Sequence, residues 1–190
     1  MGQEYPKIDD SIREWIEKHK VFFVSTASLA TDGLVNCSPK GLDAFRVLEE
    51  RSIAYLDLTG SGVETIAHLK ESRRITIMMC AFEGPPKIIR FYGRGEVFEK
   101  GDDEFAELIG AFGDTLGARS IIKIDVERII DSCGYSVPKY EFKEARDTLR
   151  KWAYTKGEEG VLEYKASKNT KSLDGLEGLS GDLGDLEPRI

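Results

Sequence analysis

Strand patterns follow one another along most of this chain, and this succession constrains the fold more than any other feature. The strand patterns are rich in β-branched, aromatic and alternating apolar residues, with turn signals such as Thr31-Asp32-Gly33 between them. Predicted strands cover residues 21–27, 34–38, 52–58, 74–82, 87–98 and 120–126. Strand follows strand too often for a doubly wound fold, in which strands and helices alternate. We therefore expect a mainly β fold with flanking helices, in which six antiparallel strands close partly into a barrel.

Helical spacing of apolar residues appears between the strands and after the last of them. Helices are predicted over 9–20, from the end of a glycine-rich loop to about residue 71, and over 102–112, 145–155 and 158–168. The Pro39-Lys40-Gly41 turn is expected to end the second strand. From Ser172 the chain is rich in glycine, leucine and acidic residues and is expected to be irregular. We predict a barrel domain over 1–132 and, over 133–190, a helical extension and acidic tail packed on the barrel.

Charge and composition narrow the classes of partner. The formal net charge is −7, which argues against a nucleic acid partner, because nucleic acid needs a basic surface. No apolar run approaches the roughly 20 residues of a membrane helix, and the polar start of the chain does not resemble a signal peptide. We expect a cytoplasmic protein without a membrane partner. The three cysteines are far apart and only two histidines are present, so no metal site is expected.

The strand-loop-helix unit AYLDLTGSGVETIAHL is the strongest local signal for a ligand. The strand ends at Leu58, Gly60 and Gly62 allow a tight turn, and a helix begins with unpaired amides and a positive dipole end. Such a helix start can bind an anion, with hydroxyls such as Thr59 and Thr65 as further donors. The unit matches neither a Walker loop nor a dinucleotide-binding fingerprint. A plain connecting loop with a capped helix is the alternative interpretation.

Polar groups also occur in the segments that precede and follow this unit in the sequence. Ser38 and Lys40, in NCSPKG, offer a hydroxyl and a cation to a phosphate, although a solvated turn lysine is the alternative. The strands RRITIMM and KIIRFYGRG carry a cluster of arginines for which surface ion pairing is the alternative. These arginines are Arg73, Arg74, Arg90 and Arg94.

Taken in order, VFFVSTAS, LVNCSPKGL, SIAYLDLTGSGVETIAHLKESRRITIMM and IIRFYGRGEVF resemble the pyridoxamine 5'-phosphate oxidase-like family of split-barrel proteins that bind flavin mononucleotide (FMN). The resemblance covers roughly residues 11–130. It implies a six-stranded antiparallel split barrel, FMN as cofactor, a homodimer, and a small-molecule substrate or reductant. The residues expected to bind the cofactor are Ser38, Pro39, Lys40, Leu58, Thr59, Gly60, Glu64, Thr65 and Arg90.

Ile88 stands where the oxidases of this family can present a glutamine to the flavin ring, and the chain departs from them at two further places. Glu64-Thr65 stand where the oxidases usually have a basic pair, and the C-terminal segment that grips pyridoxamine phosphate is not recognisable. Both differences argue against pyridoxamine phosphate as the substrate. We expect an FMN-dependent oxidoreductase acting on an unknown small molecule, with no side chain predicted to be catalytic. The alternatives are a non-catalytic module that binds flavin, deazaflavin or haem, and a structural dimer with a vacant site, which Glu64 supports best.

Overall fold

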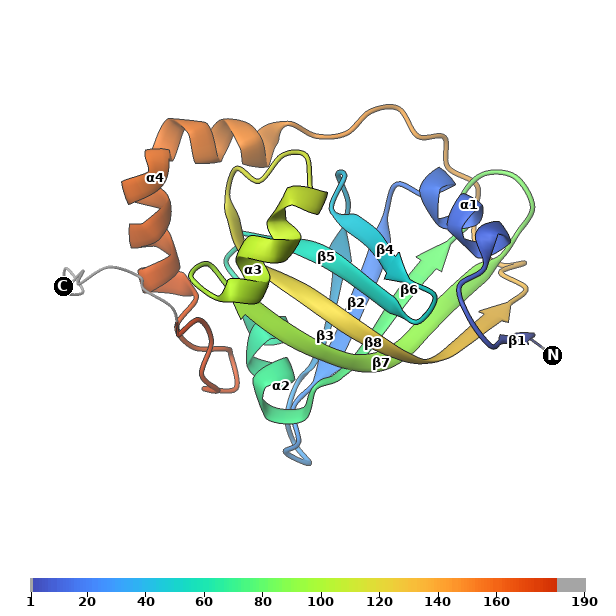
Figure 1. Ribbon diagram of the computed structural model, residues 1–190, viewed down its shortest axis with the longest axis horizontal. Helices are drawn as coiled ribbons and strands as arrows, with labels where there is room; N and C mark the ends of the chain where they lie inside the picture. The colour runs from blue at the N-terminus through green and yellow to red at the C-terminus, as the bar shows by residue number, and fades with distance from the viewer. Residues whose placement is uncertain (1, 181–190) are drawn as a thin grey trace.

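The computed structural model describes residues 2–180, which form a strongly curved antiparallel sheet with helices at its edges (Figure 1). The strand order is β3-β2-β6-β7-β8-β5-β4, and β1 pairs with β8. The strands are β1 Glu4–Tyr5, β2 Phe22–Ala27, β3 Val35–Lys40, β4 Phe45–Glu49, β5 Ser52–Leu58, β6 Arg74–Cys80, β7 Ile88–Glu99 and β8 Ala118–Ser132. The helices are α1 Asp10–Lys18, α2 Glu64–Ser72, α3 Asp103–Leu108 with a 3-10 turn Ile109–Ala111, and α4 Thr148–Lys168.

The predicted class is confirmed, but the predicted number of six strands is wrong, because residues 2–180 contain eight. The short β1 and the half-buried β4 were missed. In β4, the charged residues of Phe45-Arg-Val-Leu-Glu49 and a register shift between Val47 and Glu49 obscure the strand pattern. The predicted strand end at Pro39 is also wrong, since β3 continues to Lys40. Proline is tolerated there because β3 is an edge strand with one side free of partners.

The helices lie close to where periodicity placed them. Asp9 caps α1 by accepting a hydrogen bond from the Ile12 amide at 2.9 Å, and Ile12 and Ile16 are buried. In α4, Gly157 has φ 69° and ψ 175°, so the long helix is two helical pieces that meet at a kink, close to the predicted pair of helices.

Strand β5 is buried on both faces, and this burial positions the candidate site. Ile53 and Tyr55 belong to the main core inside the curved sheet, whereas Ala54 and Leu56 pack in a second cluster with Phe105 of α3. Because side chains alternate along a strand, Asp57 continues the inward row of Ile53 and Tyr55. The last inward position of this apolar strand therefore carries a carboxylate that is completely buried.

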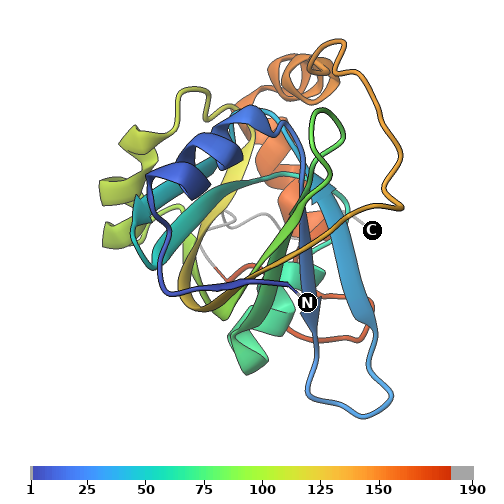
Figure 2. The ribbon, with the colours of Figure 1, turned by 90° about the vertical axis from the view of Figure 1, so that its right-hand side faces the viewer.

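The chain beyond β8 runs as an extended arm over residues 133–147 and then enters α4 (Figure 2). After α4, the irregular segment lies beside α2 and the loop that precedes it, as hydrogen bonds from Asn169 and Leu173 show. The predicted division into a 1–132 domain and a 133–190 extension stays a prediction. The final part of the predicted tail, 181–190, lies outside the described residues.

Candidate functional site

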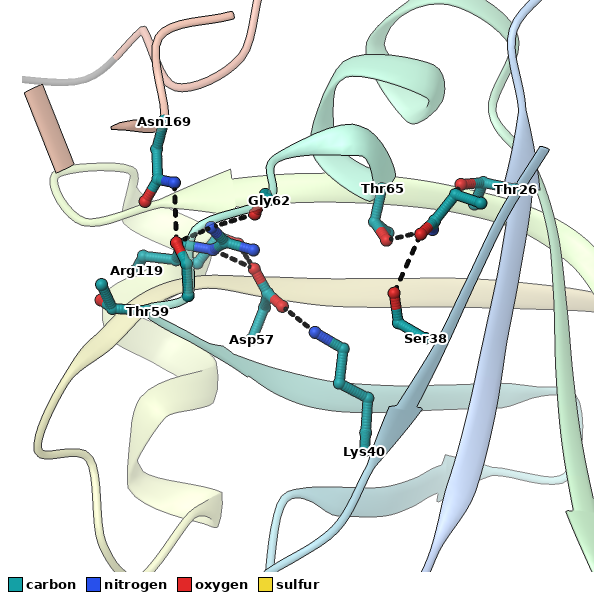
Figure 3. A network of polar contacts seen from close by, with 12 residues as sticks. Thr26, Ser38, Lys40, Asp57, Thr59, Gly62, Thr65, Arg119 and Asn169 are labelled. Atoms are coloured by element: carbon teal, nitrogen blue, oxygen red, sulfur yellow. Dashed lines mark hydrogen bonds and ion pairs between the residues drawn. The ribbon is translucent and has the colours of Figure 1, made fainter. Parts of the chain in front are cut away.

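The inner face of the edge strand β3 carries a row of polar side chains. Asn36, Ser38 and Lys40 alternate with the exposed Val35, Cys37 and Pro39. In the antiparallel pairing with β2 they lie opposite the inward-facing Thr26, Val24 and Phe22. The polar row therefore points to the inside of the curved sheet, toward the end of β5 and the start of α2 (Figure 3).

The first part of the site is a hydroxyl–amide cluster formed by Thr26, Asn36, Ser38, Thr65 and His68. The side-chain amide of Asn36 donates to the Thr26 hydroxyl at 3.1 Å and to the Thr65 hydroxyl at 2.9 Å. Its carbonyl oxygen accepts from Ser38 at 2.9 Å, and Thr26 lies 3.1 Å from Nδ1 of His68. The cluster joins β2, β3 and α2. It fixes the orientation of the Ser38 and Thr65 hydroxyls, which point into the groove between β3, β5 and the start of α2.

The second part is an ion cluster formed by Lys40, Asp57 and Arg119. One carboxylate oxygen of Asp57 accepts from Lys40 at 3.0 Å, and the other accepts from Arg119 at 2.5 Å. Asp57 is fully buried and Arg119 is 4% exposed, whereas the Lys40 side chain is 22% exposed. Burial by itself would raise the pKa of Asp57, but the charges of Arg119 and Lys40 and their hydrogen bonds outweigh it and lower the pKa to about 2. The three groups carry a net charge of about +1.

The loop that contains Gly60 and Gly62, which we call the glycine loop, lies above the ion cluster in the view of Figure 3. Arg119 donates to the Gly62 carbonyl at 2.7 Å, and the side-chain amide of Asn169 donates to the Gly60 carbonyl at 2.9 Å (Figure 3). Both the amide and the hydroxyl of Thr59 donate to the Gly117 carbonyl at 2.8 Å. The two loop carbonyls are thus held toward Arg119 and Asn169, and the loop is fixed at both ends.

The start of α2 has the properties of an anion site. Its N-cap residue, Val63, has no side-chain oxygen, and no side chain within residues 2–180 caps this end of the helix. The first-turn amides of a helix have no partner within the helix, so they are available to an external acceptor. Lys40 and Thr65 lie on the two sides of this groove, and the ammonium group of Lys40 has donors beyond the one that Asp57 accepts. These residues fit a phosphate group.

The predicted cofactor residues fall into two groups. Ser38, Lys40 and Thr65 line the groove together. The remaining residues are directed elsewhere: Leu58 packs in the cluster under α3, Thr59 is bonded to Gly117, Pro39 faces outward, and the Gly60 carbonyl is bonded to Asn169. All nine assignments stay predictions, because position alone does not show binding.

Glu64 and Arg90 need separate comment. A carboxylate oxygen of Glu64 accepts the Leu173 amide at 3.3 Å, so this side chain is joined to the segment after α4. Arg90 pairs with Met78 on outward-facing positions and donates to Ser132 at 3.0 Å, on the opposite face of the sheet from the groove. A role for Arg90 in cofactor binding would therefore need a ligand that reaches the outer face.

The other arginines follow the surface interpretation. Arg73 pairs with Glu96 at 2.6 Å and Arg94 pairs with Glu127 at 3.1 Å, and these side chains are about half exposed. Arg74 donates to the Ser28 carbonyl at 3.1 Å. Ion pairs of this kind contribute little to stability and indicate no ligand.

Sequence reasoning missed several residues that shape the groove. Asp57 and Asn36 each had a detectable signal: Asp57 is an acid at an inward position of an apolar strand, and Asn36 shares the period-two row with Ser38 and Lys40. Arg119 and Asn169 had none, since they are 57 to 109 residues away from the loop carbonyls that they contact.

A cleft of about 1130 Å³ adjoins the groove at Pro39 and Lys40. Its apolar walls include Phe22, Phe45 and Met79, and residues 142 and 144–146 of the extended arm form its rim. Across residues 2–180, no group of three or more His, Cys, Asp or Glu side chains is arranged to hold a metal ion. No helix in that same stretch is both long and apolar enough to cross a membrane.

Comparison with known proteins decides the family. The sequence profile described as "Pyridoxamine 5'-phosphate oxidase" matches residues 8–133, about two thirds of the chain. The chain belongs to the pyridoxamine 5'-phosphate oxidase family. The match ends at the last residues of β8, so it covers the whole sheet except β1 and excludes the arm, α4 and the segment after it.

Relatives in sequence and in structure agree with this assignment. The pyridoxamine 5'-phosphate oxidase family protein ustO of Aspergillus flavus is 36% identical over 186 residues, covering 89% of this chain and 74% of the relative. Among solved structures, HupZ of Group A Streptococcus has a TM-score of 0.51 at 20% identity over 70% of this chain and 99% of its own. A Clostridium acetobutylicum protein related to general stress protein 26 has a TM-score of 0.51 at 13% identity, covering 73% and 94%. The two structures support the fold.

Proposed function

We propose that this protein binds FMN in the groove between β3, β5 and the start of α2, and that it is an FMN-dependent oxidoreductase acting on a small molecule. The observation that carries the proposal is the uncapped start of α2, which carries Thr65 in its first turn and lies near Ser38 and Lys40 of β3. A phosphate there would meet helix amides, hydroxyls and an ammonium group together. Membership of the pyridoxamine 5'-phosphate oxidase family supports a flavin as the ligand.

The cleft next to Lys40 supports the second half of the proposal. A flavin ring is flat and mostly apolar, and Leu42 together with the partly buried Phe45 and Val47 supplies apolar surface beside the groove. When bound, FMN supplies hydride or electron transfer, while the protein contributes binding and orientation. The residues of the chain therefore need to hold the phosphate and to present the ring to a substrate, and no acid–base side chain is obligatory.

The proposed assembly is a homodimer, and the proposed compartment is the cytoplasm. Strand β3 is an edge strand whose outer face exposes Val35 at 76%, next to Cys37 and Pro39. A second copy would cover this edge. The three cysteines are all free, as suits a reducing compartment. Light scattering after gel filtration tests the dimer, and a mass equal to one chain contradicts it.

Cofactor binding is tested by spectroscopy and by titration. The purified protein is expected to be yellow and to release FMN on heating, or to take up added FMN if it is purified without cofactor. A protein that stays colourless with excess FMN contradicts the proposal. Lys40→Ala should weaken FMN binding about ten- to a hundredfold, because it removes a charge-assisted contact to phosphate. Lys7→Ala is the matched control, since Lys7 also pairs with an acidic residue, Glu50, but is exposed and lies outside the cleft.

A last measurement separates an enzyme from a carrier. Rapid bleaching of the bound flavin by NADH or NADPH, followed by reoxidation, supports an oxidoreductase. Bound flavin that no reductant bleaches supports the alternative of a non-catalytic module. Uptake of a deazaflavin in preference to FMN would support the deazaflavin alternative. Haem is the weakest alternative, because His68 is fully buried and His19 lies against Trp15.

A further inference from the structure

The segment after α4, residues 169–180, lies outside the part of the chain that the family profile matches, yet it contacts the glycine loop, α2 and the turn between β2 and β3. We call it the C-terminal segment. It has no helix or strand of its own beyond an isolated bridge between Lys171 and Glu177. Its contacts with the body of the protein are hydrogen bonds to the glycine loop, to α2, to the turn between β2 and β3 and to Glu99 of β7, together with Leu179, which packs in the main core.

Asn169 is the contact with the glycine loop. The side chain is 0% exposed, and its Nδ2 group donates to the Gly60 carbonyl at 2.9 Å (Figure 3). Its Oδ1 atom has no hydrogen-bond partner within residues 2–180. Burying an amide with an unpaired oxygen is costly, so packing alone does not favour asparagine at this position. The interaction it makes, with one carbonyl of the loop, accounts for its presence.

Both the first and the last turn of α2 are held by the same segment. The Leu173 amide donates to Glu64 at 3.3 Å, and Lys70 donates to the Gly178 carbonyl and to Ser180. Gly178 lies so close to Asn169 and Val63 that a Cβ atom there would overlap both. This contact gives a structural reason for an acidic residue at position 64, because the carboxylate of Glu64 binds a backbone amide of the C-terminal segment.

Asp174 extends the contacts to the other wall of the groove. Its carboxylate accepts the Leu34 amide at 3.0 Å and lies 3.6 Å from Nε2 of His68. His68 in turn contacts Thr26 in the hydroxyl–amide cluster. The C-terminal segment therefore reaches both sides of the groove: the glycine loop through Asn169 and the cluster through Asp174.

We propose that the C-terminal segment is a positioning element of the phosphate site, and that Asn169 is the positioning residue. Asn169 fixes the Gly60 carbonyl on the side of Arg119, and this orientation of the peptide turns the following loop amides toward the groove. The ligand chemistry addressed is a phosphate monoester, so the proposal rests on the proposed FMN function. It assigns a role in that function to a part of the chain that the family profile does not include.

The test compares FMN with riboflavin, which has the same ring and lacks the phosphate. Asn169→Ala should weaken FMN binding about tenfold and change riboflavin binding less than twofold, as measured by flavin fluorescence titration. Lys171→Ala is the matched control, because Lys171 is exposed in the same segment and pairs only with Glu177. Equal weakening of both ligands, or no weakening of either, overturns the proposal.

A second variant covers the case in which Asn169→Ala does not fold. Gly178→Ala retains asparagine at position 169. The new Cβ atom would overlap Val63 and the Asn169 backbone, and it would force the segment away from both. It should also weaken FMN binding selectively relative to riboflavin. An unchanged ratio of the two affinities in a folded Gly178→Ala protein overturns the proposal.

Hydrogen exchange separates this proposal from the proposed function. In the wild-type chain without ligand, the hydrogen-bonded amides that flank the loop, those of Thr59 and Ala67, should exchange slowly, and Asn169→Ala should accelerate their exchange while β5 and β7 stay protected. If wild-type protein binds neither FMN nor inorganic phosphate, the proposed function fails, and the exchange result still decides whether Asn169 holds the loop. Unchanged exchange at Thr59 and Ala67 overturns the positioning role in either case.

Discussion

The two halves of the groove are built from different chemistry. The ion cluster of Lys40, Asp57 and Arg119 joins β3, β5 and β8 through charges, two of them almost completely buried. The hydroxyl–amide cluster joins β2, β3 and α2 through uncharged groups centred on Asn36. Both clusters cross between secondary-structure elements where the sheet is open, at the edge strand β3.

This difference indicates different roles. Buried charges are costly to remove from water, so each member of the ion cluster depends on the others, and loss of one leaves an uncompensated charge. Hydroxyls can rotate and either donate or accept, so the hydroxyl–amide cluster can adjust to a ligand at little cost. The ion cluster thus fixes the shape and the positive charge of the groove, and the hydroxyl–amide cluster supplies adaptable contacts.

The largest effect is expected from breaking the ion cluster. Asp57→Ala should lower the free energy of unfolding by about 3–5 kcal/mol, because Arg119 would stay buried without its partner. Urea unfolding followed by circular dichroism measures this change. Glu4→Ala is the control, because it breaks an exposed pair with Arg128 and should leave stability nearly unchanged. A small effect of Asp57→Ala would mean that the cluster is solvated in solution.

The pH dependence of stability distinguishes the two clusters next. The pKa of Asp57 is about 2 in the folded chain and 3.8 ordinarily, so the unfolded chain binds this proton more readily. The stabilisation is therefore complete above pH 4 and is lost as the pH falls through 2, by about 2 kcal/mol in total. A carbon-13 NMR titration of the Asp57 carboxyl measures the pKa directly. A midpoint at or above 3.8 would contradict the buried ion cluster.

Breaking the hydroxyl–amide cluster should cost less. Asn36→Ala leaves the hydroxyls of Thr26, Ser38 and Thr65 without this partner, and the expected loss in the free energy of unfolding is about 1–2 kcal/mol. FMN affinity should fall as well, because the two groove hydroxyls lose their fixed orientation. Chemical unfolding and FMN titration measure the two effects. Thr31→Ala, in the exposed turn between β2 and β3, should change neither.

The smallest effect concerns the one negative charge at the start of α2. Glu64→Gln keeps an oxygen that can accept the Leu173 amide but removes the charge near the proposed phosphate. FMN binding should strengthen about two- to fivefold, which corresponds to about 0.4–1 kcal/mol and lies within the range for a charge at a helix start. Titration at low and high salt checks this, because screening should remove the difference. Weaker FMN binding in this variant would show that the carboxylate serves the ligand.

The sequence was sufficient for strands that are rich in buried apolar residues. Strand β5 was predicted with the same bounds that the structure has, and the start of α2 was predicted from Gly60 and Gly62. The two strands that were missed lack this signal, since β1 has only two residues and β4 is half-buried with charged positions. Local patterns therefore predict the strands and helices whose own sequence shows a clear apolar pattern.

The site was only partly predictable for the same reason. Ser38, Lys40 and Thr65 lie in local motifs and converge in the structure. The partners that orient them come from distant segments: Arg119 from β8, which contacts the carbonyls of the loop, and Asn169 from beyond α4. No local rule connects these residues to the glycine loop, because their proximity is a property of the sheet topology and of the path of the chain after β8.

The 109 residues between Gly60 and Asn169 also have a consequence in time. Translation proceeds at about 5–20 residues per second, so a nascent chain carries its glycine loop for roughly 5–20 s before Asn169 has even been synthesised. Strand β8, and with it Arg119, is made well before that point. In the cell the residues of the groove would therefore become available in a fixed order. The ion cluster would be complete first, and the hydrogen bond from Asn169 to the Gly60 carbonyl would form last.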